Sequence, residues 1–537
     1  MKRLIRAQRT DDNSHLPEPD LCPPMAAHCR PIHPLHHAVY PMIEKLAACC
    51  TALGTDAYLV GGFVRDWLLS ARPGQDIDIA VSGDFEAIAR EIAREFGGTV
   101  VPLGPAHGVV RVAGQRDDDA WPWNIDVEGI SGTIEEDLSR RDFSVNAMAI
   151  PLADWPSMKS VIDPLGGRAD LATKTIRALG PKVFQDDPGR LMRAIRLAGQ
   201  LRFRVEPGTS KRIAADSRLL ADVSPERVRE EFLNILSLDG AKGQLEVLDH
   251  FNLFEQVVPE LQSAKGVDQP NMHYWDVWGH TMHAVEAAEL ITKGHQNSPI
   301  YSCVPWTQDS EAHFSQHATD GHTRGTVLKL AALFHDVAKP QTKTQDETGR
   351  TRFFGHSEQG AEIATERLTQ LRVSAKGIEM VAKMVEHHLR PTGMKDGDEW
   401  PTNRAIHRYF RDVGDVAIDT LYLSLADYLA AKGPELVHEE WLNHARMIGH
   451  ILHVGTSEPV SPTSTRVITG HDLLTHFKIQ PGPEIGAVLE RVEEARAAGE
   501  IETKEQALEM AANALRYLAE QLATESSNGG LPSEGPQ

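Results

Sequence analysis

Strand-like segments occur in only one part of this chain, and this restriction limits its fold more than any other feature of the sequence. Short apolar runs bounded by turn residues are found at 57–61, 76–81, 99–103, 108–112 and 124–130, with a helical stretch at 84–96 among them. Apolar runs of about four to eight residues are typical of strands, whereas a periodicity of about 3.6 residues is typical of helices. We therefore predict an α/β or α+β domain between about residues 40 and 178.

After Asp187 the strand pattern nearly disappears, and amphipathic helical patterns continue to about residue 523. The 537 residues exceed what one hydrophobic core supports, because single domains usually hold about 50–200 residues. Polar and Pro/Gly-rich stretches mark the boundaries. They predict six parts: a mobile N-terminal tail at 1–36, the head at 37–178, a helical region at 179–262, a second helical domain at 263–430 with a polar insertion at about 293–324, a C-terminal helical region at 431–523 and a disordered tail at 524–537.

Composition and targeting signals predict a cytoplasmic protein. The chain is 41% hydrophobic and 24% charged, as ordinary folded domains are, and no apolar run approaches the roughly 20 residues that a bilayer span needs. Lys2, Arg3 and Arg6 are not followed by the apolar segment of a signal peptide. The five cysteines contain no CxxC pair, so we expect reduced thiols rather than a disulfide framework or a cysteine zinc site, and no membrane partner.

The net charge argues against general nucleic-acid binding, but one segment is an exception. Fifty-five Lys and Arg residues against 76 Asp and Glu give a formal charge of −21, which repels phosphates over most of the surface. The segment 190–212 has one acidic residue, Glu206, and seven basic ones: Arg190, Arg193, Arg196, Arg202, Arg204, Lys211 and Arg212. A basic stretch of this kind predicts a local contact with a nucleic-acid backbone.

Two short motifs in the predicted head form a candidate nucleotide site. The strand at 57–61 ends in Gly61-Gly62 and is followed by a helical segment, so backbone N–H groups and the positive end of a helix dipole face a turn where a phosphate can bind. Asp76 and Asp78 alternate on a predicted strand, which places both carboxylates on one face, and such oxygen ligands can hold Mg²⁺. Alone, each motif is usually a turn or a solvated strand face. In this order and spacing they indicate a site for a nucleotide and a metal ion.

This order of motifs resembles the polymerase-beta-like nucleotidyltransferase superfamily, whose head is a mixed sheet with helices. Further motifs narrow the resemblance to the tRNA nucleotidyltransferases, or CCA-adding enzymes, and their poly(A) polymerase relatives: VGGFVRD at 60–66, RRDFSVNAMA at 140–149, DPLGGRADL at 163–171, DDPGRLMRAIRLA at 186–198 and SPERVREE at 224–231. The resemblance covers roughly residues 57–236. It implies an α+β catalytic head followed by an all-α RNA-binding region.

The resemblance also implies roles for individual residues of the head. The expected nucleotide-binding residues are Gly62, Arg65, Arg141 and Asn146. The expected catalytic carboxylates, which would hold Mg²⁺ for a two-metal transfer, are Asp76, Asp78 and, from a later strand, Asp126. Glu128 lies on the same strand face as Asp126, and a purely structural role for Asp126 is an equal alternative.

The motif that starts at Asp187 is expected to select the base. In the family its Asp and first Arg pair with the base edge, here Asp187 and Arg190 with Arg193 nearby, and a spacing of three residues keeps them within one broad helical face. A carboxylate accepts from N4 of cytosine or N6 of adenine, whereas O4 of uracil and O6 of guanine would face its lone pairs. Alternatively, Asp187 and Pro188 only begin the helix as N-cap and first residue. Gly189 stands where the family usually has a larger apolar residue, and it is expected to loosen the first turn.

Histidines and acids in the helical half resemble the HD phosphohydrolase superfamily. The expected metal ligands of this all-α HD domain are His280, His335, Asp336, His356, His387 and Asp427, with His283 and His388 outside the site. Imidazoles and carboxylates suit a divalent ion such as Mn, Fe, Co, Ni or, more weakly, Mg, whose bound water can attack a phosphoester. Because the chain has 25 histidines, ordinary exposed or core positions are the alternative.

Together these motifs predict an enzyme that adds nucleotides to the 3′ end of tRNA, by CCA addition or repair, from CTP and ATP. Alternatives within the family are addition of CC only or of A only, and poly(A) synthesis; the segment 84–112 resembles CCA-type or A-adding members more than poly(A) polymerases. A flexible loop near 114–123 is expected to influence this specificity. From other classes, an HD hydrolase with an inactive RNA-binding head and a non-catalytic RNA chaperone stay open, as does the oligomeric state.

Overall fold

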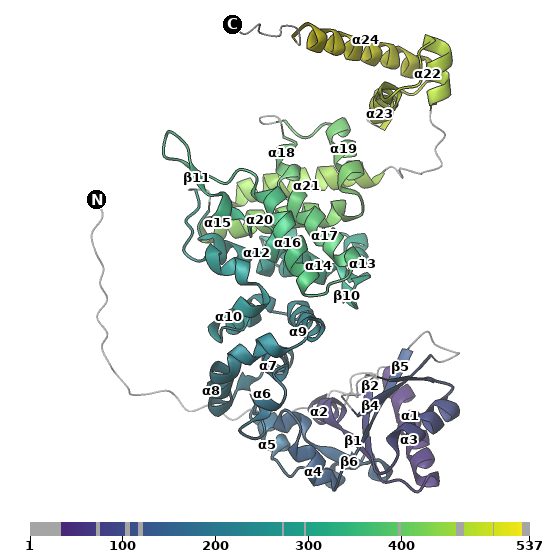
Figure 1. Ribbon diagram of the computed structural model, residues 1–537, viewed down its shortest axis with the longest axis vertical. Helices are drawn as coiled ribbons and strands as arrows, with labels where there is room; N and C mark the ends of the chain where they lie inside the picture. Colours follow the sequence, from purple (N-terminus) through teal and green to yellow (C-terminus); the bar gives the residue numbers. More distant parts are fainter. Residues whose placement is uncertain are drawn as a thin grey trace, which may run out of the picture. The chain divides into compact units, whose positions relative to one another are not determined.

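The structure is a computed structural model that describes residues 34–70, 76–102, 108–115, 122–270, 273–294, 297–395, 399–457, 467–497 and 499–528. The chain divides into two compact units (Figure 1). The first contains the described residues up to Ser131 together with Ala149–Val161, and the second contains Gly132–Met148 and the described residues from Ile162 onward. The six-part division made from the sequence stays a prediction.

The first unit is built on a six-stranded sheet in the order β3-β4-β5-β2-β1-β6. Its strands are β1 (Ala57–Val60), β2 (Asp76–Val81), β3 (Thr99–Pro102), β4 (Val109–Gln115), β5 (Pro122–Gly129) and β6 (Ala149–Pro151), and its helices are α1 (Pro34–Ala52), α2 (Gly61–Ser70) and α3 (Phe85–Phe96). Neighbours β2 and β5 are parallel, and the other four pairs are antiparallel. The predicted α+β head with a mixed sheet is confirmed, and all five predicted strands are present.

Alternation along β2 separates an apolar face from a carboxylate face. Ile77 and Ile79 are buried, whereas Asp76 is exposed and Asp78 is half-buried. Helix α3 begins at a side-chain cap from Asp84, and its buried apolar stripe packs against β4 and β5. The aspartate pair of β2 is therefore held by a strand whose opposite face is anchored in the core.

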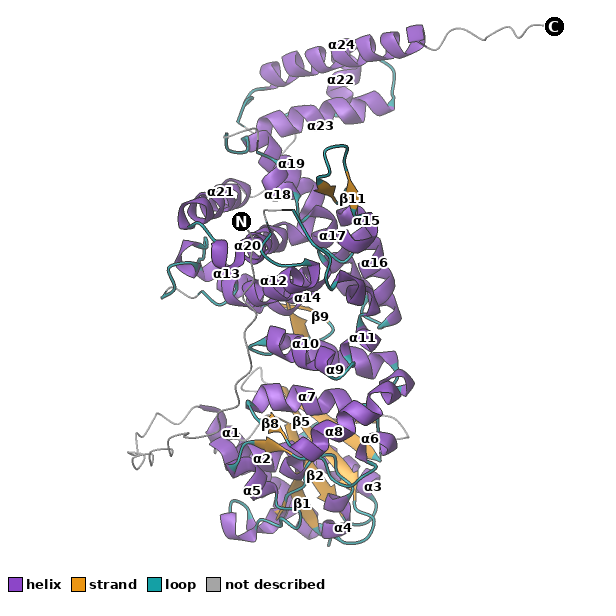
Figure 2. Cartoon of the chain, turned by 90° about the vertical axis from the view of Figure 1, so that its left-hand side faces the viewer, coloured by secondary structure: helices purple, strands orange, loops and turns teal. Residues whose placement is uncertain are grey.

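The second unit is largely helical (Figure 2). Its first helices are α4 (Ile134–Ser139), α5 (Gly167–Ala172), α6 (Val183–Asp186), α7 (Arg190–Leu201), α8 (Pro207–Asp216), α9 (Pro225–Ser237), α10 (Ala241–His250) and α11 (Phe254–Val257). Helix α7 packs against both α9 and α10. The helical prediction after Asp187 is confirmed apart from short strand pairs: β7 (Thr175–Ile176) with β8 (Arg204–Val205), β9 (His317–Thr319) with β10 (His322–Thr323), and β11 (Thr344–Gln345) with β12 (Thr351–Arg352).

Five longer helices form the next part of the second unit: α12 (Val277–Ile291), α14 (Arg324–Phe334), α16 (His356–Gln370), α17 (Ala375–His387) and α20 (Ala417–Lys432). Helix α12 packs against α14 and α20, and α17 packs against α14 and α16. The segment 293–324, predicted as a polar insertion, contains α13 (Gln308–Ser315). The buried ring of Phe314 packs there against Tyr422, so part of the predicted insertion belongs to the core.

The remaining helices are α15 (Lys339–Thr342), α18 (Arg390–Gly393), α19 (Asn403–Val413), α21 (His438–Ser457), α22 (Gly470–Phe477), α23 (Pro483–Ala497) and α24 (Lys504–Asn528). Leu473, Val488, Val492 and Ala507 belong to an apolar cluster shared by α22, α23 and α24. Helix α24 continues past residue 524, where the tail was predicted to start, and α1 begins at Pro34, before the predicted end of the N-terminal tail. The rest of both predicted tails lies outside the described residues, and none of the described helices could cross a membrane.

A buried ion network joins α12, α14 and the start of α10. Glu289 on α12 accepts the backbone N–H groups of Gly240 and Ala241 at 2.8–3.1 Å and the Lys293 ammonium at 2.8 Å. Lys329 of α14 lies 3.7 Å from the same carboxylate and donates to a backbone carbonyl. Burial alone would raise the pKa of Glu289, but these donors and cations lower it, while burial lowers the pKa of Lys329 to about 8. Glu289 is thus ionised at neutral pH.

Glu289→Gln is expected to lower the free energy of unfolding by about 3 kcal/mol, because Lys329 would be left buried without its countercharge. The contribution of Glu289 is present above the ordinary carboxyl pKa and is lost as the pH falls through its lowered pKa. Urea unfolding at pH 7 measures the effect, and exposed Glu311→Gln is the control. Equal stability of the two variants would contradict this account.

Candidate active site and metal centre

Three carboxylates lie on one face of the sheet in the first unit. Asp78 on β2 and Asp126 on β5 are direct partners in the parallel register, and Asp76 is paired with Asn124, whose amide donates to Asp76 Oδ1 at 3.1 Å. Neighbouring strands are about 4.8 Å apart, so the side chains of Asp78 and Asp126 stand side by side. Ile125 and its neighbours on the opposite face are buried. The donor set of hard oxygens fits Mg²⁺.

Arg111 of β4 holds the third carboxylate. Its Nε and Nη2 donate to the two oxygens of Asp126 at 2.7 and 2.8 Å, and the strand register makes the two residues direct partners. The hydrogen bonds to Asp126 raise the pKa of Arg111, although partial burial opposes this, and the charges of Asp76 and Asp78 add to it. Sequence reasoning missed Arg111, although it is the one charged residue in the apolar run GVVRV.

The glycine turn has the predicted position. Gly61 is the first residue of α2 and has φ +67°, a conformation that favours glycine. A Cβ on Gly62 would lie 3.4 Å from Nη2 of Arg65, so the guanidinium packs closely over this turn. Arg65 is buried and makes a two-point ion pair with Asp66 at 2.7 and 2.8 Å. A nucleotide contact by Gly62 or Arg65 stays a prediction.

In the second unit, Asp142 connects the motif at 140–149 to α7. The Arg193 guanidinium lies 2.8 Å from Asp142 Oδ2, and Asn146 donates to Asp142 Oδ1 at 3.2 Å. Arg190 donates to the backbone carbonyl of residue 140 at 3.3 Å, and Arg141 pairs with residue 137 of α4 at 3.2 Å. The structure therefore brings together four of the predicted nucleotide-binding residues, Arg141, Asn146, Arg190 and Arg193, around one short segment.

Asp187 lies in the turn before α7 and is neither inside the helix nor its N-cap, which is Gly189. The prediction that Asp187, Arg190 and Arg193 share one helical face is wrong for Asp187. Its Oδ1 accepts the N–H of Gly189 at 3.1 Å, and Arg227 of α9 donates to both carboxylate oxygens at 2.9 Å. Partial burial would raise the pKa of Asp187, but Arg227 and the Gly189 N–H lower it, so the carboxylate is an ionised acceptor.

The predicted RNA-binding residues fall into two groups. Arg196 pairs with Glu231 of α9 at 2.6 Å, and Arg212 donates to the backbone carbonyls of residues 178 and 180 at 3.1 and 2.8 Å, so both side chains stabilise the fold. The exposed members are Arg202, Arg204 and Lys211. RNA binding by these residues stays a prediction, and residues 116–121 of the predicted specificity loop lie outside the described part of the chain.

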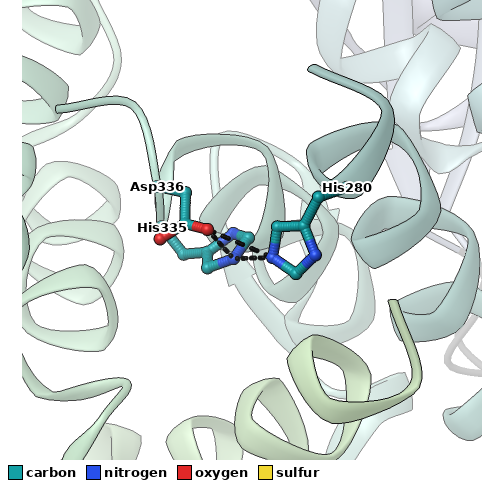
Figure 3. Close-up of side chains that lie close together, drawn as sticks. All are labelled: His280, His335 and Asp336. Atoms are coloured by element: carbon teal, nitrogen blue, oxygen red, sulfur yellow. Dashed lines mark hydrogen bonds and ion pairs between the residues drawn. The ribbon is translucent and has the colours of Figure 1, made fainter. Parts of the chain in front are cut away.

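Four of the predicted HD residues converge in the helical bundle (Figure 3 shows His280, His335 and Asp336). Nε2 of His280 on α12 lies 3.0 Å from Nε2 of His335, 3.1 Å from Asp336 Oδ2 and 3.1 Å from Asp427 Oδ1 on α20. His335 and Asp336 directly follow α14, and His335 Nε2 is 3.2 Å from Asp336 Oδ2. His280, His335 and Asp336 are fully buried. Two nitrogens and two carboxylates meet at one point, as ligands do around a metal ion.

The other oxygen of Asp336 faces a second pair of histidines. Asp336 Oδ1 lies 3.4 Å from Nε2 of His356 and 3.9 Å from Nε2 of His388, which is 1% exposed. His387 lies half-buried on α17 outside this group. The choice of His387 over His388 from the sequence is therefore corrected, because α17 ends at His387 and the following residue turns its ring into the bundle.

Hydrogen bonds at the far side of three rings fix their tautomers. Nδ1 of His335, His356 and His388 lies 2.6–2.8 Å from the backbone carbonyl three residues earlier, which makes each Nδ1 the donor and leaves Nε2 for the centre of the cluster. Among the described residues, Nδ1 of His280 and Nε2 of His356 are buried and have no hydrogen-bond partner. This donor set fits one or two divalent ions, with Asp336 between them.

Lys339 is a further member of this site that sequence reasoning missed. Its buried ammonium lies 2.6 Å from Asp336 Oδ2 and donates to Gln269 at 2.6 Å. The segment LFHDVAK places the lysine three residues after the aspartate, which was the available signal. The lysine supplies one positive charge to a cluster that contains two carboxylates, the buried Asp336 and the half-buried Asp427.

Metal affinity at the histidine cluster is expected to rise with pH, about tenfold per unit below pH 9. Burial alone would lower the pKa of His335, but Asp336 and Asp427 raise it to about 10, so a metal ion must displace a proton at neutral pH. Mn²⁺ titrations followed by electron paramagnetic resonance between pH 6 and about 9 test this. His387→Ala is the control, because His387 lies outside the cluster and its loss is expected to leave the pH dependence unchanged. An affinity independent of pH in the unaltered protein would contradict the assignment of His335.

Four family models match successive parts of the chain: "Poly A polymerase head domain" at residues 57–177, "Probable RNA and SrmB- binding site of polymerase A" at 202–265, "HD domain" at 277–432 and "tRNA nucleotidyltransferase domain 2 putative" at 429–512. The order of these models follows the order of the motifs. The third spans all the residues of the histidine cluster.

Two curated relatives align with most of the chain. An A-adding tRNA nucleotidyltransferase of Deinococcus radiodurans is 32% identical over 459 residues, which cover 84% of this chain and 94% of the relative. A CC-adding tRNA nucleotidyltransferase of Thermus thermophilus is 33% identical over 460 residues, which cover 84% and 92%. The Thermotoga maritima CCA-adding enzyme complexed with tRNA has the same fold, with a TM-score of 0.54 at 20% identity over 90% of this chain and 96% of that one. The chain belongs to the tRNA nucleotidyltransferase and poly(A) polymerase family and carries an HD domain.

Proposed function

We propose that this protein adds nucleotides to the 3′ end of tRNA from CTP and ATP. The observation that carries the proposal is the trio of Asp76, Asp78 and Asp126 on one face of the parallel strands β2 and β5. Mg²⁺ bound by these carboxylates would activate the attacking 3′-hydroxyl and neutralise the triphosphate. We assign base selection to Asp187 and Arg190, because an ionised carboxylate accepts hydrogen bonds from the amino groups of cytosine and adenine.

The proposal also concerns which nucleotides are added: CC only, A only or the complete CCA sequence. Both relatives that align with 84% of the chain add part of the CCA sequence, one A and one CC. This supports addition of CC or of A by one member of a pair of enzymes, with complete CCA addition and poly(A) synthesis as the competing outcomes.

The experiment is incorporation of each labelled nucleotide, singly and together with Mg²⁺, into tRNA transcripts that end before CCA, after C and after CC. Products are resolved at single-nucleotide length. The expected result is addition of C, of A or of both, and in each case extension goes no further than the completed CCA end. Long A tails would favour a poly(A) polymerase, and no extension of any transcript would contradict the proposal.

We also propose that the HD domain is a metal-dependent phosphohydrolase. The specific observation is the convergence of His280, His335, Asp336 and Asp427. Beside them, Nδ1 of His356 and of His388 is bonded to a backbone carbonyl, which leaves Nε2 of each ring free for a metal ion. Divalent ions held there would supply an activated water. Phosphomonoesters, 2′-phosphates and 2′,3′-cyclic phosphates are the proposed substrates, and Lys339 would balance the charge of Asp336 in the absence of the metal.

A further inference from the structure

The carboxylate of Asp187 is bound by an arginine that lies outside the motif at 186–198. Nη2 of Arg227, which lies forty residues later on α9, is 2.9 Å from both Oδ1 and Oδ2. Oδ1 also accepts the N–H of Gly189 at 3.1 Å, whereas Nε of Arg190 is 3.8 Å from Oδ2. Among the described residues, Arg227 is therefore the cation nearest to Asp187, to which base selection is assigned.

Gly189 provides the space through which Arg227 reaches Asp187. Its φ of −60° and ψ of −23° are ordinary helical values, so the backbone does not require glycine at this position. A Cβ on Gly189 would lie 2.6 Å from Nη2 and 3.0 Å from Cζ of Arg227, and 3.2 Å from Asp187 Oδ1. Since the end of an arginine side chain is flexible, a methyl group here would displace the guanidinium rather than the backbone.

The helix that carries Arg227 is itself fixed against α7. Arg196 of α7 pairs with Glu231 of α9 at 2.6 Å, and both side chains are mostly buried. Helices α7 and α9 also pack directly against each other. Arg227, one turn before Glu231 on α9, therefore approaches Asp187 from a defined direction.

We infer that Arg227, admitted by the missing side chain of Gly189, is a positioning residue that fixes the Asp187 carboxylate for base selection. Each carboxylate oxygen has about two lone-pair directions, so Arg227 and the Gly189 N–H leave others free for the amino group of cytosine or adenine. A carboxylate with its plane fixed rejects the carbonyl oxygens of uracil and guanine more strongly than one that can rotate away. The inference deepens the proposed nucleotide addition and rests on it.

The test is the ratio of kcat/KM for CTP or ATP to that for UTP or GTP, on the tRNA end that the unaltered protein extends. Gly189→Ala and Arg227→Ala are each expected to lower this ratio about 10- to 100-fold, the effect of losing a charged hydrogen bond. Arg227→Lys is expected to retain part of it. The matched control is Gly243→Ala on α10, where a Cβ meets no atom within 4 Å. A merely structural defect would lower kcat/KM for all four nucleotides alike and leave the ratio unchanged.

The double variant Gly189→Ala with Arg227→Ala separates this inference from simpler explanations. Because the closest contacts of a Cβ on Gly189 are with the Arg227 guanidinium, the double variant is expected to come close to Arg227→Ala alone. Additive losses in the double variant, or an unchanged ratio in both single variants, would overturn the inference while the proposed function stands. An unaltered protein that extends no tRNA would overturn both.

Discussion

Replacing Asp76 or Asp78 with Asn is expected to lower nucleotide addition by at least about 1,000-fold, which corresponds to roughly 4 kcal/mol of transition-state stabilisation. Asn keeps the shape of the side chain but lacks the charge and one of the two acceptor oxygens that a metal ion requires. Because both residues are on the solvent-facing side of β2, the substitution is not expected to disturb the core of Ile77 and Ile79. Single-turnover extension of tRNA measures the effect.

The matched control is Asp154→Asn, which removes an exposed carboxylate from the same unit. It is expected to leave the rate within about twofold of the unaltered protein, as surface substitutions away from a site usually do. Hydrolysis by the HD domain is expected to be unchanged in all three variants. Addition by Asp76→Asn or Asp78→Asn at more than about a tenth of the normal rate would contradict the metal assignment.

The second large effect is expected at Asp336. Asp336→Asn would remove the carboxylate whose two oxygens face His280 and His335 on one side and His356 and His388 on the other. We expect loss of the divalent ion on gel filtration and a fall in hydrolysis of 2′,3′-cyclic nucleotides of at least about 1,000-fold. Metal content per chain and the hydrolytic rate are measured on the same samples.

His387→Ala is the informative companion variant, because His387 was predicted as a ligand and lies outside the cluster. It is expected to keep both the metal and the hydrolytic rate, and His388→Ala is expected to lower both. Retention of the metal by Asp336→Asn, or its loss from His387→Ala, would be inconsistent with the geometry. Nucleotide addition is expected to continue in every one of these variants.

The sheet and the carboxylate face were predictable because they depend on local pattern. Alternation along 76–81 fixes which residues of β2 share a face, and the pairing of β2 with β5 then brings Asp126 beside Asp78. The HD cluster was predictable in outline, because the histidine and aspartate residues occur in a recognisable order. The choice of His387 over His388 was wrong, because neighbouring residues at a helix end point in directions that depend on where the helix stops.

Partners from distant segments could not be predicted. Arg227 and Asp187 are forty residues apart, and only the packing of α9 on α7 brings them together. The same packing explains Gly189. Its sequence propensity predicted a loosened first turn, but its φ and ψ are ordinary helical values. The glycine instead leaves room for the guanidinium of Arg227. Helix α13 within the predicted polar insertion was not foreseen either, because the polar composition there hides Phe314, which packs against Tyr422.

Extension of tRNA with selection of C and A over U and G is the activity that we propose for this chain. The most direct measurement is 3′-end sequencing of a tRNA transcript lacking CCA, and of transcripts ending in C and CC, after incubation with equal concentrations of all four nucleotides and Mg²⁺. We expect every added nucleotide to be C or A and extension to go no further than the completed CCA end. Uracil or guanine at a frequency similar to cytosine or adenine, or no extension of any transcript, would contradict it.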